Sequence, residues 1–292
     1  MKSFQNEVNI IKILKNTPVF YYGGSLYRLL KCGKPRVQRG KGEPKTDVYV
    51  KYLVDEKEFI EIKISLKQTD YNFLENKLNL ERFEAIVGKG NGTKMAEELV
   101  KSILNQDLEG FMNDVKLEYN VIRRPGEMPC VRCTTGYRLD ITNKPNGKRS
   151  FPLNLSLKEK MEVFTGATLE ERKRDAVVDG TIIKNSGIAN VMLEMDVNGN
   201  ETPQEILDAC RSLSEASFYD DFELYATLKA VNYYSNGKYE TRPLIVSVEY
   251  SYNDLVKTLE PKFIIKSPLV TKSSQVVKKL KPLLEQYVLN KD

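Results

Sequence analysis

Histidine and tryptophan are absent from the 292-residue chain, and cysteine occurs only at positions 32, 130, 133 and 210. Without histidine there is no Ser/His or Cys/His relay, no histidine-dependent nuclease motif and no zinc site that includes histidine. Four cysteines are too few for a disulfide framework in a chain of this length. We therefore expect reduced thiols, and chemistry that depends on carboxylates, lysine, tyrosine, cysteine or a metal ion.

Two of these cysteines form Cys130-Val-Arg-Cys133, which has the spacing of half a zinc knuckle. No second Cys-x-x-Cys pair and no histidine complete the motif, and Cys32 and Cys210 could do so only by convergence in space. We expect a pair of reduced thiols in a turn rather than zinc.

Other absences narrow the class of protein. No Gly-Lys pair has the upstream glycine of a GxxxxGK[ST] loop, so we expect no nucleotide cofactor. No apolar stretch approaches the roughly 20 residues of a membrane span, and the first residues lack the apolar run of a signal peptide. The composition, 41% hydrophobic and 29% charged with a net charge of +5, is that of a folded protein that tolerates a polyanionic partner. The expected location is the cytoplasm.

The first third of the sequence predicts a helix, three strands and further helices. Apolar residues recur at helical spacing over 4–14, and two aromatic and aliphatic runs flank Gly23-Gly24. Two alternating β-branched runs, 46–53 and 57–65, then predict an antiparallel hairpin. Residues 71–104 are typical of two helices broken at the sequence GKGNG.

Beyond residue 115 the patterns are weaker. We expect a helix over 203–216, a long hairpin turning at Asn236-Gly237 and a basic helix over 273–289. The tyrosines near this turn, Tyr233, Tyr234 and Tyr239, are expected to be cross-strand partners, with a DNA-gripping arm as the alternative. The charged run 171–175 is expected to be a solvated surface rather than a DNA contact.

The hairpin carries the residues of chemical interest. If its turn is centred on Glu56, paired residue numbers sum to about 112, so Asp47 faces Ser65 and the core face collects Val48, Val50, Ile60, Ile62 and Ile64. Asp47, Glu61 and Lys63 then share the opposite face, where we expect them to lie together. Two close carboxylates need a cation, and Mg²⁺ is the ion that oxygen ligands prefer. An ammonium beside the ion can orient water and stabilise charge at phosphorus.

These segments, GEPKTD and FIEIK between two helical stretches, resemble the PD-(D/E)XK nuclease superfamily, in particular type II restriction endonucleases and related phage nucleases. The resemblance implies a core of a helix, three antiparallel strands, a helix and a further strand, and a bacterial or phage-infected host cell. It also implies Asp47, Glu61 and Lys63 as catalytic residues, with the Ile62 carbonyl as a metal ligand and Glu7 as an accessory acid. Pro44 stands three residues before Asp47 rather than next to it, which departs from the literal motif.

Basic residues next to this motif are candidates for phosphate contact. Lys34, Arg36, Arg39, Lys41 and Lys45 line the loop before Asp47, and an ordinary solvated loop is the equal alternative. By the same resemblance, Lys67 and Gln68 would be further groups directed at phosphate.

We therefore expect a mixed α/β protein of the α+β class, with a nuclease core at 1–115 and an accessory region at 116–292. That region would recognise DNA, contribute to dimerisation and complete the core sheet. The expected function is Mg²⁺-dependent, sequence-specific cleavage of double-stranded DNA by a homodimer. The alternatives are a non-catalytic DNA-binding module on a nuclease-derived scaffold, or a nuclease that acts on branched DNA or RNA.

Overall fold

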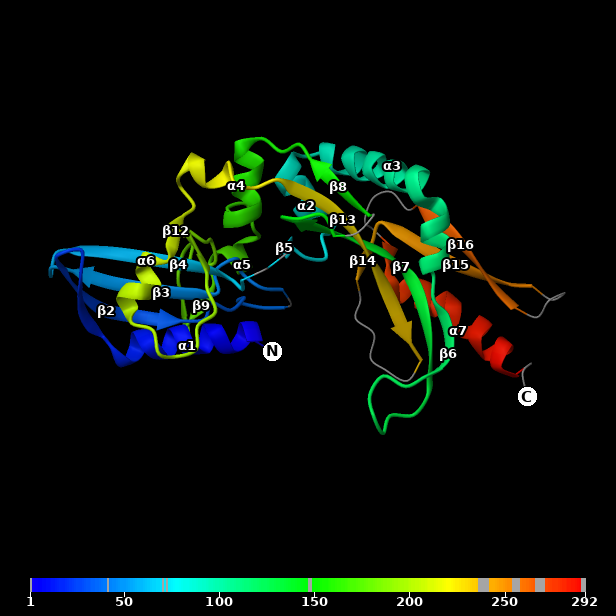
Figure 1. Cartoon of the computed structure of the whole chain (residues 1–292), viewed down its shortest axis with the longest axis horizontal. Helices are drawn as coiled ribbons and strands as arrows, with labels where there is room; N and C mark the ends of the chain where they lie inside the picture. The colour runs from blue at the N-terminus through cyan, green and yellow to red at the C-terminus, as the bar shows by residue number, and fades with distance from the viewer. Residues whose placement is uncertain are drawn as a thin grey trace. The chain divides into compact units, whose positions relative to one another are not determined.

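The computed structural model describes residues 2–40, 42–69, 71, 73–146, 149–235, 242–253, 258–265 and 271–289. The chain forms two compact units (Figure 1). Unit 1 comprises Met1–Tyr71 and Leu155–Phe222, and unit 2 comprises Asn72–Asn154 and Glu223–Asp292. The boundary that we expected at residue 115 lies inside unit 2, between α3 (Asn91–Asp114) and β6 (Leu117–Val121).

Unit 1 is built on a six-stranded mixed sheet in the order β1-β2-β3-β4-β11-β12. The first four strands form an antiparallel meander, β11 lies parallel to β4, and β12 is antiparallel to β11. Their bounds are β1 (Val19–Tyr22), β2 (Ser25–Gly33), β3 (Val48–Val54), β4 (Glu58–Lys67), β11 (Val191–Glu194) and β12 (Cys210–Ser212).

The hairpin of β3 and β4 has the predicted register. Val48 pairs with Ile64 and Lys51 with Glu61, so the paired numbers sum to 112. Asp55 and Glu56 adopt left-handed backbone conformations in the turn, with φ of 49° and 55°. The strict alternation of side chains fixes this register, because a one-residue slip would move every aliphatic side chain out of the core.

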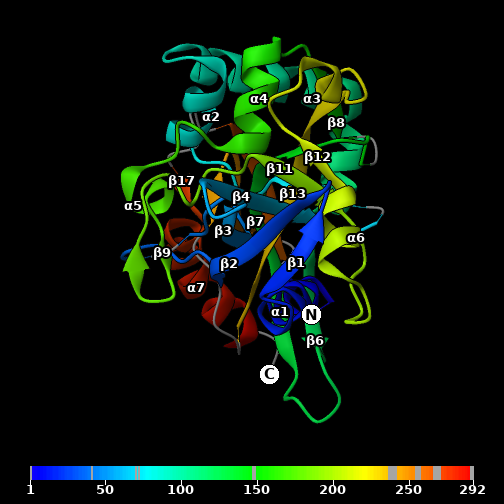
Figure 2. The same ribbon diagram turned by 90° about the vertical axis from the view of Figure 1, so that its left-hand side faces the viewer.

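Helices cover both faces of the unit 1 sheet (Figures 1 and 2). Helix α1 (Lys2–Asn16) packs on the face that carries Val48, Val50 and Ile64, close to α6 (Pro203–Asp208). Helix α4 (Leu157–Thr165) lies on the opposite face together with the 3₁₀ turn η1 (Ala216–Tyr219). Tyr49 points to that second face and is fully buried there, so both faces of the hairpin are covered at its middle.

A small subdomain joins α4 to β11. It contains α5 (Glu171–Arg174) and the short hairpin of β9 (Val177–Val178) and β10 (Thr181–Ile182). The loop that follows β2 pairs with it, since the Arg36 and Val177 backbones exchange two hydrogen bonds of 2.9 and 2.7 Å. The charged run 171–175 thus belongs to a packed element, with Glu171 exposed and residues 172–175 partly buried.

Unit 2 contains a seven-stranded sheet with the central order β16-β15-β7-β13-β8, in which β5 and β6 also pair with β7. Its strands are β5 (Phe73–Glu75), β6, β7 (Cys130–Thr142), β8 (Ser150–Leu153), β13 (Leu224–Tyr234), β15 (Val246–Asn253) and β16 (Thr258–Ile265), with the short pair β14 (Pro243–Leu244) and β17 (Thr271–Lys272). Its helices are α2 (Leu80–Val87), α3 and α7 (Ser273–Leu289).

Several expectations about unit 2 are corrected. The segments on either side of Asn236-Gly237 do not pair with each other, because β7 lies between β13 and β15. The predicted turn itself lies outside the described residues. Cys130 and Cys133 occupy strand β7 rather than a turn, and an offset of three residues directs them to opposite faces of the sheet. They therefore cannot form half of a zinc knuckle.

The α+β class is confirmed: both units combine sheets with helices that cover them. Helix α1 and helix α7 occur where the apolar spacing predicts them. The helix predicted over 203–216 ends early, because Cys210 pairs with Leu193 and begins β12. In the described part of the chain, no helix is long and apolar enough to cross a membrane.

Candidate functional site

Asp47 lies at the entrance to β3, where the chain joins the sheet. Its backbone N–H donates to the Ile64 carbonyl at 2.7 Å, and its side-chain Oδ2 accepts from the Leu66 N–H at 2.7 Å. The register places Ser65 opposite Asp47, with Lys67 two residues further along the same face of β4. Two backbone contacts thus hold the Asp47 carboxylate against the end of β4.

Three charged side chains act on this carboxylate. Burial raises the pKa of Asp47 to about 6, and the charge of Glu7 also raises it, while the Lys67 and Lys34 ammonium groups lower it. Glu7 projects from α1, is 5% exposed and accepts a hydrogen bond from Lys34, which directly follows β2. We call these four residues, Glu7, Lys34, Asp47 and Lys67, the Asp47 cluster.

Glu61 and Lys63 belong to a separate network within the β3–β4 hairpin. Glu61 accepts a hydrogen bond from the Tyr49 hydroxyl at 2.7 Å and lies 3.6 Å from the Lys51 ammonium. The Lys63 ammonium donates to the Asn185 carbonyl at 3.4 Å, and burial lowers its pKa although Glu61 raises it. These contacts give both residues partners within the protein.

The expectation that Asp47 and Glu61 lie together is wrong in this register. Glu61 lies four positions before Ser65, which faces Asp47, and four positions along a strand span about 13 Å. Magnesium binds oxygen at about 2.1 Å, so one ion cannot contact both carboxylates across that span. Asp47 precedes β3 and Glu61 lies within β4, and the two residues do not share a site.

Ile62 has no position suited to a metal. Its side chain packs against the core cluster of unit 1. The Glu61 and Lys63 carbonyls accept hydrogen bonds from Asn190, from its side-chain amide at 2.9 Å and its backbone N–H at 3.0 Å. Because successive carbonyls of a strand alternate in direction, the Ile62 carbonyl points the other way, into the ladder with β3.

The basic loop before Asp47 is held firmly by the α5 subdomain. Besides the Arg36 pairing, the Arg39 carbonyl accepts from the Arg172 guanidinium at 2.8 Å, and the Lys45 N–H donates to the Gly187 carbonyl at 2.9 Å. Arg36 and Arg39 are exposed and Lys45 is partly buried, whereas Lys41 lies outside the described residues. The loop therefore presents cations from a fixed backbone.

Acidic residues offset part of the charge on this surface. Glu170 pairs with Arg172 at 2.7 Å and with Lys173 at 2.9 Å, which lowers the pKa of Glu170 to about 2. Arg174 likewise lies 3.4 Å from Asp175. Among the described residues of the loop, Arg36 and Arg39 are the exposed cations.

Lys67 is the last residue of β4, and Gln68 directly follows it. The Lys67 carbonyl accepts from the Met195 N–H at 3.2 Å, and the Gln68 carbonyl accepts from the Tyr71 N–H at 3.1 Å. Both side chains are partly buried. Of these two residues, only Lys67 affects the pKa of Asp47, which its charge lowers.

The residues that sequence reasoning underestimated are Lys34, Ser65 and Lys67. The hairpin arithmetic already placed Ser65 opposite Asp47, but the resemblance of the Glu-Ile-Lys motif assigned the catalytic roles to Glu61 and Lys63. Lys34 was expected only as a phosphate contact of the basic loop, because its contact with Glu7 joins the end of β2 to α1 and has no local pattern.

The chain matches no protein-family model, no curated protein and no solved structure. Its function must therefore be inferred from geometry. Within the described residues, no group of three or more carboxylate or thiolate side chains is placed to hold a metal ion. Glu7 is 5% exposed, Asp47 is partly buried, and the charge of Glu7 acts on the Asp47 carboxyl. Mg²⁺ is commonly held by one or two carboxylates with water as its other ligands. Carboxylate oxygens of this kind are the donors that magnesium prefers.

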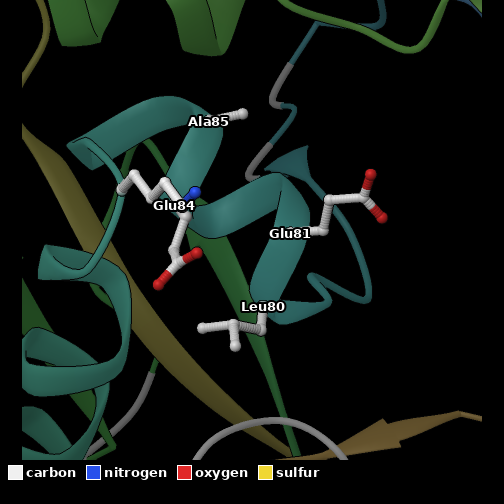
Figure 3. A pocket seen from close by; sticks show the side chains of 5 residues that line it. Leu80, Glu81, Glu84 and Ala85 are labelled. Atoms are coloured by element: carbon white, nitrogen blue, oxygen red, sulfur yellow. The ribbon is translucent and has the colours of Figure 1, made fainter.

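Unit 2 has a hollow of about 390 Å³ at α2, lined by Leu80, Glu81, Glu84, Ala85 and Lys89 (Figure 3). The Glu81 and Glu84 side chains extend away from each other in this view. Glu84 instead accepts a hydrogen bond from the Gly90 N–H at 3.1 Å, at the start of α3. The hollow therefore lacks converging acids and is a weaker candidate than the Asp47 cluster.

Proposed function

We propose that unit 1 is a magnesium-dependent nuclease that hydrolyses phosphodiester bonds in DNA at the Asp47 cluster. The observation that carries the proposal is the Asp47 carboxylate, which the Leu66 N–H holds at 2.7 Å at the end of β4 and on which the charges of Glu7 and Lys67 act. A buried acid with a raised pKa beside specific charges is a typical feature of functional sites. We also propose that the substrate is double-stranded DNA and that it is cleaved at a specific sequence, as by a restriction-type enzyme.

The order of elements supports this function. Unit 1 runs from α1 through the antiparallel strands β2, β3 and β4 to α4, and then to β11, which lies parallel to β4. This order, a helix, three antiparallel strands, a helix and a further strand, is that of the PD-(D/E)XK superfamily. Residues 72–154 of unit 2 are inserted between β4 and α4, which the sequence pattern did not reveal.

Each residue of the cluster has a role in the proposed reaction. Asp47 and Glu7 would hold Mg²⁺, which supplies a Lewis acid for the phosphate and lowers the pKa of a bound water. The Leu66 N–H fixes the Asp47 carboxylate, and Lys34 fixes that of Glu7. Lys67 faces the same end of the hairpin, where its ammonium can orient water and stabilise the negative charge that develops at phosphorus. Arg36 and Arg39 would contact the backbone phosphates of the substrate.

Glu61 and Lys63 have a structural role in this proposal. They connect β4 to β3 through Tyr49 and Lys51, and to the segment before β11 through Asn185. A substitution at Glu61 that keeps these hydrogen bonds should leave the cleavage rate nearly unchanged. Asp47 and Glu61 thus provide a matched pair of acids.

The test is cleavage of supercoiled plasmid and phage DNA with Mg²⁺ by wild-type, Asp47→Asn and Glu61→Gln proteins, with EDTA as a further control. Loss of one metal-ligand or charge-stabilising group typically lowers turnover by about 10²–10³-fold. We expect that loss for Asp47→Asn, complete loss with EDTA, and a rate within about threefold of wild type for Glu61→Gln. Equal loss of activity in both variants would show that Glu61 belongs to the active site. If neither wild type nor any variant cleaves DNA, the nuclease proposal is refuted.

A second candidate, a non-catalytic DNA-binding module, is favoured by one observation. Ser65 rather than an acidic residue faces Asp47, and it is 3% exposed. The absence of cleavage on duplex, branched DNA and RNA, combined with retained binding to duplex DNA, would support this candidate.

Double-strand cleavage by this site would use two copies of the chain. One face of the unit 1 sheet carries exposed apolar side chains, with Val19, Tyr21 and Phe59 at 43%, 69% and 63% exposure. Exposed apolar surface of this kind often marks a protein interface. We propose a homodimer through this face, and light scattering of wild-type and Tyr21→Ser proteins tests it.

A further inference from the structure

The loop that joins β6 to β7 in unit 2 combines exposed apolar side chains with arginines. Residues 122–129 have the sequence Ile-Arg-Arg-Pro-Gly-Glu-Met-Pro. Ile122 is 61% exposed and Met128 is 77% exposed, among the highest values for large hydrophobic residues in the described part of the chain. Figure 1 shows this loop extending beyond the neighbouring elements of unit 2. Its apolar groups therefore lie at a projecting tip and not over the core.

Several contacts hold this tip in one conformation. The Glu127 N–H donates to the Arg124 carbonyl at 3.1 Å and closes a turn around Gly126, whose φ is 84°. Pro125 restricts the backbone within this turn, and Pro129 restricts it two residues after the turn. The Arg123 guanidinium stacks on the Tyr234 ring of β13, with 4.5 Å to the ring centroid. The tip is thus pre-organised, which lowers the entropy cost of binding a partner.

The base of the loop is already neutralised. Arg132 of β7 pairs with Glu118 of β6 at 3.0 Å, and Lys116 lies 3.8 Å from the same carboxylate. At the tip itself, Arg123 and Arg124 outnumber the single acid Glu127. Positive charge therefore lies beside the exposed apolar pair, where it complements a polyanion.

We propose that the β6–β7 loop is a wedge that enters the minor groove of a DNA duplex, with Ile122 and Met128 inserting between base steps and Arg123 and Arg124 binding the flanking phosphates. Proteins that kink DNA use isoleucine, methionine or proline in this way, next to arginine or lysine. One or two inserted side chains are enough for such a kink. The choice of duplex DNA as the partner rests on the proposed nuclease function.

A lipid bilayer is the less suitable partner for this tip. Membrane binding scales with the apolar area that is buried, and even a whole myristoyl chain gives only marginal binding. Ile122 and Met128 together offer fewer carbons than such a chain. Two basic residues add little to this, since about 4–8 are typical of segments that bind acidic lipids.

The test uses the full chain in EDTA, so that the duplex stays intact. A 30-base-pair duplex labelled at both ends reports its bend by energy transfer, and fluorescence anisotropy reports its affinity as salt is varied. The variants are Ile122→Ser/Met128→Ser and Arg123→Ser/Arg124→Ser. The matched control is Leu108→Ser/Met112→Ser, which removes two exposed hydrophobic residues of α3, 54% and 40% exposed, in the same unit.

Wild type and the α3 control should bend the duplex by about 20–90°. The Ile122/Met128 variant should no longer bend the duplex and should bind about tenfold more weakly, since its serines cannot insert between base steps. The Arg123/Arg124 variant should lower the slope of log affinity against log salt by about 0.9 for each phosphate that it no longer neutralises. Wild-type bending and affinity in the Ile122/Met128 variant would overturn the proposal. So would weaker binding of that variant to acidic liposomes without any effect on DNA.

These outcomes are separable from those of the nuclease test. Cleavage that depends on Asp47 but not on the loop variants would leave the function intact and refute the wedge. Tip-dependent bending without cleavage by any protein would support the wedge and refute the nuclease proposal.

Discussion

Replacing Asp47 by asparagine should stabilise the metal-free protein at neutral pH. The pKa of this carboxyl in the folded state is about 6, against an ordinary value of 3.8, because burial opposes its ionised form. A difference of 2.2 pKa units at 1.36 kcal/mol each corresponds to about 3 kcal/mol of folding free energy. Asparagine retains an oxygen that can accept from the Leu66 N–H, so the substitution removes the charge and keeps the hydrogen bond.

The sign of the pH dependence follows from the direction of the shift. A carboxyl with a raised folded-state pKa contributes stability that is fully present below its unfolded pKa of 3.8, and that contribution is lost as the pH rises through 6. Wild type therefore loses this contribution between pH 4 and 7, and Asp47→Asn does not. The two proteins should have nearly equal stability at pH 4 and differ by about 2–3 kcal/mol at pH 7.5.

Urea unfolding in EDTA, followed by circular dichroism because the chain has no tryptophan, measures this difference. Asp55→Asn is the matched control: its carboxylate accepts from the Leu26 N–H, and that hydrogen bond lowers its pKa. Its contribution is present above the unfolded pKa and lost as the pH falls, so Asp55→Asn should destabilise the protein at pH 7.5. Added Mg²⁺ should stabilise wild type and not Asp47→Asn. Lower stability of Asp47→Asn at pH 7.5 in EDTA would refute the account of this site.

Three further predictions concern the surroundings of the cluster. Lys67→Met should lower the cleavage rate about 10²-fold or more, whereas Lys63→Met should affect mainly the free energy of unfolding. A larger loss of single-turnover cleavage rate for Lys63→Met than for Lys67→Met would contradict the role proposed for Lys67. Gly187→Ala should destabilise unit 1 by about 2–3 kcal/mol, since its Cβ would lie 1.9 Å from the Lys173 carbonyl oxygen, and a thermal unfolding midpoint equal to that of wild type would contradict this. Burial raises the pKa of Cys32, Cys133 and Cys210 to about 12, so their thiols should react slowly with a disulfide reagent at pH 8 and readily after unfolding. Stoichiometric zinc, measured by elemental analysis, would contradict the placement of Cys130 and Cys133 on β7.

Local alternation predicted the centre of unit 1 correctly, because register is a short-range property. Val48, Ile64 and their neighbours could be assigned to the core from the period of two and the position of the turn. The same reasoning failed for β13 and β15, where the Asn236-Gly237 signal suggested a hairpin. A strand that is more than 80 residues earlier in the chain, β7, pairs with both, and no local pattern can reveal such an insertion.

The candidate site was predicted in part for a related reason. Asp47 and the accessory residues Glu7 and Lys67 could be named from sequence, but which acid lies near Asp47 depends on strand offset and on helix α1. Glu7 is 40 positions from Asp47 in sequence, so only tertiary packing brings their charges together. The acid of the Glu-Ile-Lys motif, Glu61, lies four positions from Ser65, the residue that faces Asp47 in the hairpin register.

The structure also gives a physical reason why the motif residues need no catalytic role. Glu61 and Lys63 are partly buried, so their charges require partners inside the protein. Tyr49, Lys51 and Asn185 supply those partners, and each additional contact makes it more costly to free the charges for a substrate. Asp47 differs in this respect: burial raises its pKa, and the Leu66 N–H and two lysines only partly offset this cost. A cation bound at Asp47 and Glu7 would remove that cost, which is why ion binding, stability and pH dependence should change together at this one position.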